Sequence, residues 1–138
     1  MGSHRFVFNP GTSVHKDLTK QLSVDLSADI YFYGHNDHSN ALDQRLTQHP
    51  TTEWQTYLNY AWNKGFNTSI GYQGHRGGSQ YLDGTFNGSM TDYDEIRFAA
   101  AKSVSQHFQI LGELNHQFAA NGGFRQNLGA SIRLVYIF

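Results

Sequence analysis

One short segment of the sequence gathers side chains that could bind a metal ion. His35, Asp37, His38 and His49 lie close together along the chain, and imidazole with carboxylate at short spacing can hold a divalent transition metal. A solvated polar loop contains the same residue types without any ion. The loop is the simpler interpretation, so we predict neither a metal site nor a cofactor.

The same segment contains the residue types of a hydrolase. His38 is followed by Ser39, with Asp37 and Asp43 nearby, and a Ser hydroxyl activated by a His is a nucleophile for acyl transfer. All of these residues are neighbours within one loop, which is a weak basis for a fixed catalytic geometry. We predict no catalytic residue and no enzymatic activity.

Closely spaced glycines suggest a third kind of site, a loop that cradles phosphate. Gly77, Gly78 and Gly84 lie within one segment, but no Lys-Ser or Lys-Thr pair follows them. No helix is predicted to present its N-terminus to a phosphate either. We expect a flexible turn here.

Charged and amide side chains recur at alternate positions of several segments, where they could line a pore and select permeants by field and size. They could equally pair into a ladder that fills the pore. Because acids and bases come from different segments and could produce a transverse field, we favour the lining role. The candidates are Asp25, Asp29, Glu53, Arg97, Glu113, Asn115, Arg125 and Arg133.

The elements that must position these residues are β-strands. From Leu22 to Phe32 the apolar residues occupy every second position, and a period of two predicts a strand with one apolar and one polar face. Similar alternation recurs along the chain, although Pro10 removes a hydrogen-bond donor from the first strand and Gly11 weakens it. The expected strands cover 5–17, 22–32, 52–63, 66–75, 95–104, 108–118 and 124–138.

The connections between these strands alternate in length. Segments 18–21, 63–65 and 105–107 are short, whereas 34–51 and 77–91 are long. Short periplasmic turns and long extracellular loops are typical of outer-membrane β-barrels. We therefore predict an all-β, antiparallel transmembrane barrel wall of about seven or eight strands.

Composition narrows the alternatives. The net charge of -1 gives no basic face for nucleic acid. The absence of Cys removes disulfide frameworks and thiolate zinc sites. No run approaches the roughly 18 apolar residues of a transmembrane helix. The strands of a soluble β-sandwich would also alternate between apolar and polar residues. The features that distinguish a membrane barrel from a sandwich are the charged residues on the polar face of the strands and the aromatic residues at their ends.

Aromatic side chains cluster near both ends of the predicted strands, as in the two aromatic girdles of a membrane barrel. The lipid bilayer, or a detergent in its place, is therefore the first expected partner. The predicted girdle residues are Trp54, Trp62, Phe66, Tyr72, Phe108, Phe118, Phe124, Tyr136 and Phe138.

The two ends of the chain carry separate expectations. Residues 1–4 look like the remnant of an expression tag, which leaves 5–138 as the barrel segment. The alternating segment 131–138, which ends in Phe138, resembles the signal read by the barrel assembly machinery, a second expected partner. The same ending could occur by chance on a soluble strand.

Several motifs resemble the outer-membrane family labelled meta-pathway of phenol degradation. They are the stretch Arg45-Leu46-Thr47-Gln48-His49-Pro50 with the strand that follows to Trp62, Gly71-Tyr72, and the loop 77–84, which reads Gly-Gly-Ser-Gln-Tyr-Leu-Asp-Gly. The likeness runs from about Leu22 to Phe138. It implies a barrel about twice this length that carries small, often aromatic, hydrophobic compounds, and it carries over no catalytic or binding residues.

Seven strands is an awkward number, because single-chain bacterial barrels have an even number from 8 upward. An eighth strand could lie within 77–88, the chain could be the C-terminal half of a larger barrel, or half-barrels from several chains could combine. We favour the larger barrel, with a homo-oligomer as the alternative. The expected function is passive passage of small solutes. The alternatives are a structural half-barrel without transport and, less favoured, a barrel enzyme that acts on lipids.

Overall fold

The computed structural model describes residues 5–40, 42–122 and 125–137, and it contains strands but no helix within them. Within these residues there is therefore no helix long and apolar enough to cross a membrane. The strands are β1 (Val7–Phe8), β2 (Gly11–Asp17), β3 (Leu22–Tyr33), β4 (Leu46–Gln48), β5 (Thr51–Asn63), β6 (Phe66–Gly77), β7 (Gln80–Leu82), β8 (Thr85–Phe86), β9 (Asp92–Ser103), β10 (Phe108–Asn121) and β11 (Gly129–Tyr136).

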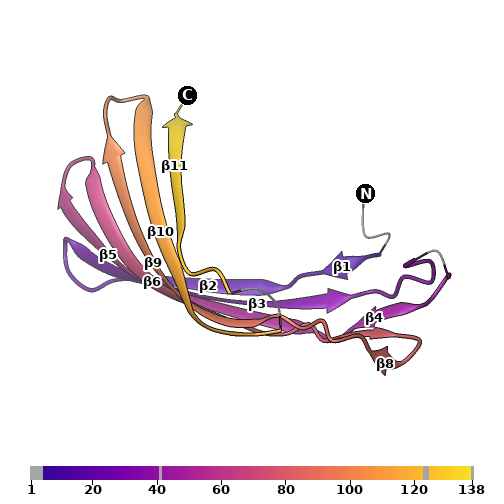
Figure 1. The fold of residues 1–138 in the computed structure, drawn as a ribbon. Helices are drawn as coiled ribbons and strands as arrows, with labels where there is room; N and C mark the ends of the chain where they lie inside the picture. The colour runs from indigo at the N-terminus through magenta and orange to yellow at the C-terminus, as the bar shows by residue number, and fades with distance from the viewer. Residues whose placement is uncertain (1–4, 41, 123–124, 138) are drawn as a thin grey trace.

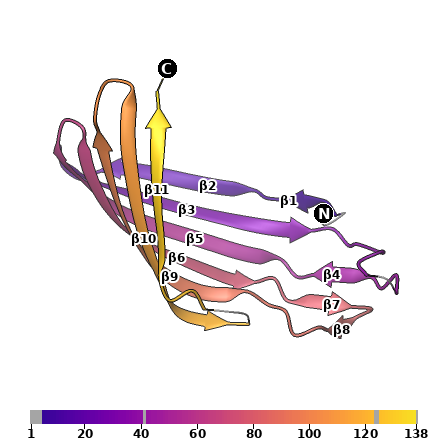
Figure 2. The same cartoon turned by 45° about the horizontal axis from the view of Figure 1, so that its top comes forward.

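The long strands form one strongly curved antiparallel sheet, which we call the wall (Figures 1 and 2). Its order is β1 and β2 together, then β3, β5, β6, β9, β10 and β11. Along the wall, each strand pairs with the next wall strand in the sequence. β1 and β2 pair with different parts of β3 on the same side, so together they occupy one position. The described wall therefore has seven strand positions, as the alternation predicts.

The first wall strand is interrupted where the sequence predicts a weakness. Pro10 lies between β1 and β2 and has no N–H to donate. The side-chain amide of Asn9 instead donates to the carbonyl of Ile30 at 3.2 Å, and the Ile30 N–H donates to the Pro10 carbonyl at 3.0 Å. The strand thus crosses the proline without leaving the sheet.

A second, small sheet of β4, β7 and β8 lies at the end of the wall opposite the short turns (Figure 1). It was missed by the alternation, because strands of two or three residues show no period. Asp83 and Gly84 both have positive φ, as a two-residue hairpin turn requires, so this dipeptide was the available signal. The predicted flexible turn is therefore a hairpin, and segment 77–88 contributes no eighth wall strand.

The sequence motifs of the family resemblance meet at the base of this small sheet. Gln48 pairs with Gln80 across β4 and β7, and the Gly78 N–H donates to the Pro50 carbonyl at 3.2 Å. Next to them, Thr51 is almost fully buried and accepts a hydrogen bond from the Tyr33 hydroxyl at 3.2 Å. The two long loops are therefore fixed to the wall.

We expect Gly77→Ala to destabilise the fold at this junction. Gly77 has φ 101°, and a Cβ at this position would collide with the Pro50 carbonyl oxygen. A strained backbone of this kind costs about 1–3 kcal/mol. Equilibrium unfolding in urea, followed by Trp fluorescence, measures the loss. Gly112→Ala is the control, because a Cβ there has open space and should change stability by less than about 0.5 kcal/mol.

The last strand begins later than predicted. The sequence indicates a start at Phe124, but β11 starts at Gly129. Before it, the Gln117 N–H donates to the Gln126 carbonyl, and the Gln126 N–H donates to the Gln117 side chain. These bonds hold the connection against β10. The apolar residues of the sequence continue to alternate before Gly129, although the backbone there is not part of the strand pairing.

The packing is the reverse of a soluble protein. Among the described residues no hydrophobic side chain is buried, whereas Thr51, Gln73 and Glu95 are 1–3% exposed. The other parity presents exposed apolar side chains such as Leu26, Ile70 and Phe98. Because a concave face hides its side chains and a convex face exposes them, the polar parity lies inside the curve.

Candidate functional site

The concave polar face is the candidate site, and its central feature is an ion pair on β9. The Arg97 Nε donates to Glu95 Oε1 at 2.5 Å, and Arg97 Nη1 donates to the Tyr57 hydroxyl on β5 at 3.2 Å. The Asn115 amide on β10 donates to Glu95 Oε2 at 3.0 Å. Partners from β9 and β10 thus satisfy both oxygens of one buried carboxylate, as a buried charge requires, and Tyr57 on β5 contacts the arginine of the pair.

A second cluster lies one row nearer the long loops. Glu53 accepts from the Gln55 amide at 2.5 Å and contacts His75 Nδ1 at 3.3 Å. The His75 ring stacks on Tyr93 at 4.9 Å between centroids, and the Gln73 amide donates to the Tyr93 hydroxyl at 3.1 Å. The face therefore carries hydrogen-bonding groups and two stacked rings at the same level.

A third cluster lies nearer the short turns. Asp25 accepts from the Asn59 amide at 2.5 Å and contacts His15 Nδ1 at 2.6 Å. Ser69 donates to the Asn59 side-chain oxygen at 2.7 Å. Polar contacts thus extend along much of the concave face. The His75–Glu53 and His15–Asp25 contacts join different strands, whereas Glu95 and Arg97 pair within β9.

The predicted lining residues fall into three groups. Asp25, Glu53, Arg97 and Asn115 join the clusters above. Asp29, Glu113 and Arg133 share the same parity, because Asp29 pairs with Glu53, Glu113 with Ser131 and Arg133 with Leu111 in the ladder. Within the described residues, no ion pair or side-chain hydrogen bond is formed by these three.

Arg125 is the one lining candidate that lies outside the wall strands. It lies in the connection before β11 and its Nε donates to the Asn127 side chain at 3.0 Å. Its expected place on the last strand is wrong because β11 starts late, as described above. Glu95, Gln73 and His75 were not among the predicted lining residues. They alternate in step with Arg97 and Glu53, and this pattern could have assigned them to the same polar face.

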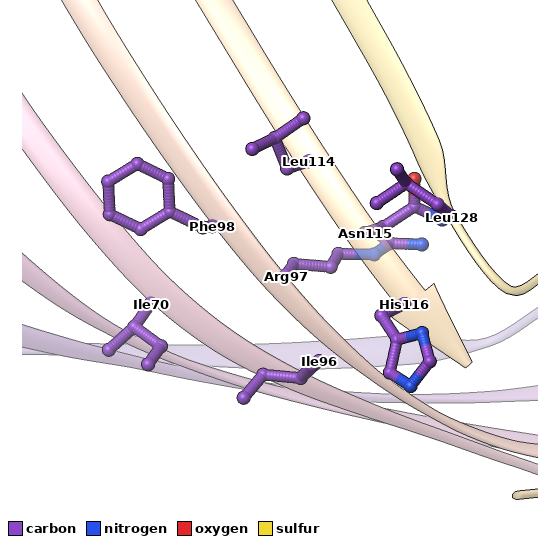
Figure 3. Close-up of a pocket in the computed structure, with 8 residues that line it drawn as sticks. All are labelled: Ile70, Ile96, Arg97, Phe98, Leu114, Asn115, His116 and Leu128. Atoms are coloured by element: carbon purple, nitrogen blue, oxygen red, sulfur yellow. The ribbon is translucent and has the colours of Figure 1, made fainter. Parts of the chain in front are cut away.

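The convex face is apolar across the middle of the wall. Ile70, Phe98 and Leu114 pair across three neighbouring strands, and Figure 3 shows them with Ile96 and Leu128 around a shallow apolar groove. Arg97 and Asn115 also border this groove in Figure 3, but their polar ends contact Glu95.

Aromatic side chains border this apolar band at both ends. Toward the loops, the Tyr72 and Phe118 rings lie 6.3 Å apart, and Arg76 lies over Trp54 at 5.4 Å. Toward the short turns, Tyr60 lies 4.8 Å from Trp62 and Phe108 lies 5.0 Å from Tyr136, with Phe66 beneath Lys102. The predicted tag at 1–4 and the predicted girdle residues Phe124 and Phe138 lie outside the described residues.

The distance between the two aromatic rows fits a membrane. Trp54 and Trp62 are eight residues apart on β5, which is about 26 Å along a strand. With a strand tilt of about 40° the vertical separation is about 20 Å, near the apolar band of roughly 25 Å in membrane barrels.

The loop with the His and Asp residues forms separate exposed pairs. His35 contacts Asp37 at 3.4 Å and His38 contacts Asp43 at 3.0 Å. Across the described residues no group of three potential ligands surrounds a metal position. Ser39 donates to the Gln44 carbonyl at 2.6 Å, so His38 and Ser39 do not form a nucleophile and base pair.

Comparisons with known proteins give a consistent result. The sequence model of the family described as "Putative MetA-pathway of phenol degradation" matches residues 1–134. A crystal structure of an outer membrane channel from Pseudomonas putida F1 matches 99% of this chain with a TM-score of 0.92 and 25% sequence identity. The match covers 51% of that channel, so this chain spans about half of its length. No curated protein matches this chain. The predicted resemblance, antiparallel fold and outer-membrane location are thereby confirmed.

Proposed function

Because this chain belongs to the family named for the MetA pathway of phenol degradation, we propose that it forms part of the wall of an outer-membrane channel. Small solutes pass through this channel passively, and the concave polar face lines their path. The observation that supports this most directly is the inverted packing, with Glu95 and Gln73 buried on one face and aliphatic side chains exposed on the other. The resemblance adds small hydrophobic or aromatic compounds as the proposed solutes.

The wall needs further strands to close. In lipid, the unpaired N–H and C=O groups at the outer edges of β2 and β11 require partners. Both edge strands run from the loop end to the short-turn end, since seven antiparallel positions begin and end in the same direction. Two copies with their loops on the same side would therefore meet as parallel strands at both seams. We propose instead that an odd number of other strands completes an antiparallel wall.

Conductance tests the channel proposal. We expect this chain, folded in detergent together with the strands that complete its wall, to produce stepwise currents in a planar lipid bilayer. Light scattering corrected for bound detergent gives the number of chains in that assembly. Folded, inserted protein that carries no current would contradict the proposal and favour the structural half-barrel.

Charge selectivity tests the lining residues. Asp29 and Glu113 have no described ion-pair partner, so their charges are available to a permeant ion. We expect Asp29→Asn/Glu113→Gln to lower the cation-to-anion permeability ratio by about fivefold or more, because each of the two unit charges, 4–8 Å from an ion, contributes about 0.5–1 kcal/mol at the dielectric of water. The reversal potential in a salt gradient measures the ratio. Asp37→Asn/Asp43→Asn, in the exposed loop, is the control, and an equal shift there would exclude a lining role.

A further inference from the structure

The lysines of this chain are distributed unevenly. All four lie at the short-turn end of the wall: Lys16 near the end of β2, Lys20 in the turn to β3, Lys64 in the turn between β5 and β6, and Lys102 near the end of β9. They therefore form a row across the wall from its first strand to β9. We call this row the lysine rim.

Two of these lysines project from the apolar face of the wall. Lys16 pairs with Val24 and Lys102 pairs with Phe66 and Ile110, all of the outward parity. The Lys102 ammonium lies 5.9 Å from the centre of the Phe66 ring. A lysine in this place lays its aliphatic stem along the wall and extends its charge to the membrane surface.

These charges form no ion pair in the part of the chain that the structure describes. Within the described residues, the ion pairs involve only Arg or His as the cation, so none of the four lysines pairs with a carboxylate. At the loop end the arrangement differs, because the outward-facing Arg76 binds both oxygens of Asp94 at 2.7 Å. An unpaired cation at the edge of an apolar band is available to an anion in the membrane surface.

We propose that the lysine rim binds the headgroups of anionic phospholipids in the periplasmic leaflet. Short turns face the periplasm in outer-membrane barrels. A zwitterionic headgroup carries its own cation beside its phosphate, whereas an anionic headgroup leaves its charge to the lysines. This interaction depends on the place of the wall in the membrane and not on passage of a solute, so a silent channel would leave it intact.

The two tryptophans provide matched reporters for the test. Trp62 lies at the lysine rim and its Nε1 donates to Thr68 at 2.9 Å, whereas Trp54 lies at the loop end beside Arg76. The chain has no other Trp, so Trp54→Phe leaves Trp62 as the single reporter and Trp62→Phe leaves Trp54. Brominated lipids quench a Trp that they contact.

The experiment compares brominated phosphatidylglycerol with brominated phosphatidylcholine in zwitterionic micelles that contain the folded full chain. We expect Trp62 to be half quenched at an about fivefold lower mole fraction of phosphatidylglycerol, the preference that one lysine gives near an anionic surface. Salt at about 1 M should abolish this preference, since it reduces the screening length to about 3 Å. The Trp54 reporter should show no preference.

Variants with equal loss of charge decide the outcome. Lys16→Gln/Lys102→Gln should reduce the preference to about twofold, because Lys20 and Lys64 keep half of the rim's charge, whereas Arg45→Gln/Arg125→Gln, at the loop end, should leave it unchanged. If the first pair does not fold, as judged by heat-modified gel mobility, Lys20→Gln/Lys64→Gln changes only the turns and should weaken the preference. No preference in the parent chain, or an equal loss in both pairs, would overturn the proposal.

Discussion

Replacing Ile70 by Arg is expected to lower the free energy of unfolding by about 2–4 kcal/mol, the cost of an Arg near the bilayer midplane on the lipid face of a barrel. Ile70 is 50% exposed and lies in the central row of the convex face, beside Leu58 and Phe98. On a soluble protein an exposed position of this kind tolerates a charge within about 0.5 kcal/mol. The two environments therefore give clearly different results.

Unfolding in urea from phospholipid vesicles, followed by Trp fluorescence, measures this cost. Ser69→Arg is the matched control, because Ser69 is the next residue on β6 but faces the concave side, where it contacts Asn59 near Asp25. We expect a loss of about 1 kcal/mol there, the value of one hydrogen bond. Equal costs at the two positions would mean that the two faces do not differ in their contact with lipid.

The strands were predictable because they are long and one face is mostly apolar. Alternation alone gives the start of β3 at Leu22 and of β6 at Phe66, and it places Glu53 and Arg97 on one face. A period of two cannot show where the chain leaves the ladder, which is why β11 starts five residues later than Phe124. The short strands β4, β7 and β8 depend on hairpin chemistry at Asp83-Gly84, which alternation does not detect.

The candidate site was predictable by face but not by partner. Parity assigns Asp25 and Arg97 to the polar side, but only register shows that Tyr57, Arg97 and Asn115 lie in one row. Register depends on turn lengths and bulges, such as the one between Gln117 and Ala119. For this reason the sequence did not distinguish between two roles of the inward charges, lining of a pore and pairing into a ladder. The structure contains both paired and unpaired charges on the same face.

The pair between Glu95 and Arg97 supports the second large effect. Arg97→Met should destabilise the folded chain by about 3–5 kcal/mol, the cost of leaving one member of a buried ion pair alone. Glu95 is 2% exposed and would keep only the Asn115 amide as a partner. Urea unfolding under the same conditions as for Ile70→Arg gives the value.

The reason for this cost is tested by removing both charges. Glu95→Gln/Arg97→Met leaves a neutral amide that needs no counter-ion and can still receive the Asn115 hydrogen bond, so we expect it to recover all but about 1 kcal/mol. Arg133→Met, on the same face but without a described carboxylate partner, should change stability by less than about 0.5 kcal/mol. If Arg97→Met also costs less than about 1 kcal/mol, water must solvate Glu95 as it solvates an exposed ion pair. The centre of the wall would then be part of an open aqueous path, and Glu95 would join Asp29 and Glu113 among the charges that a permeant ion meets.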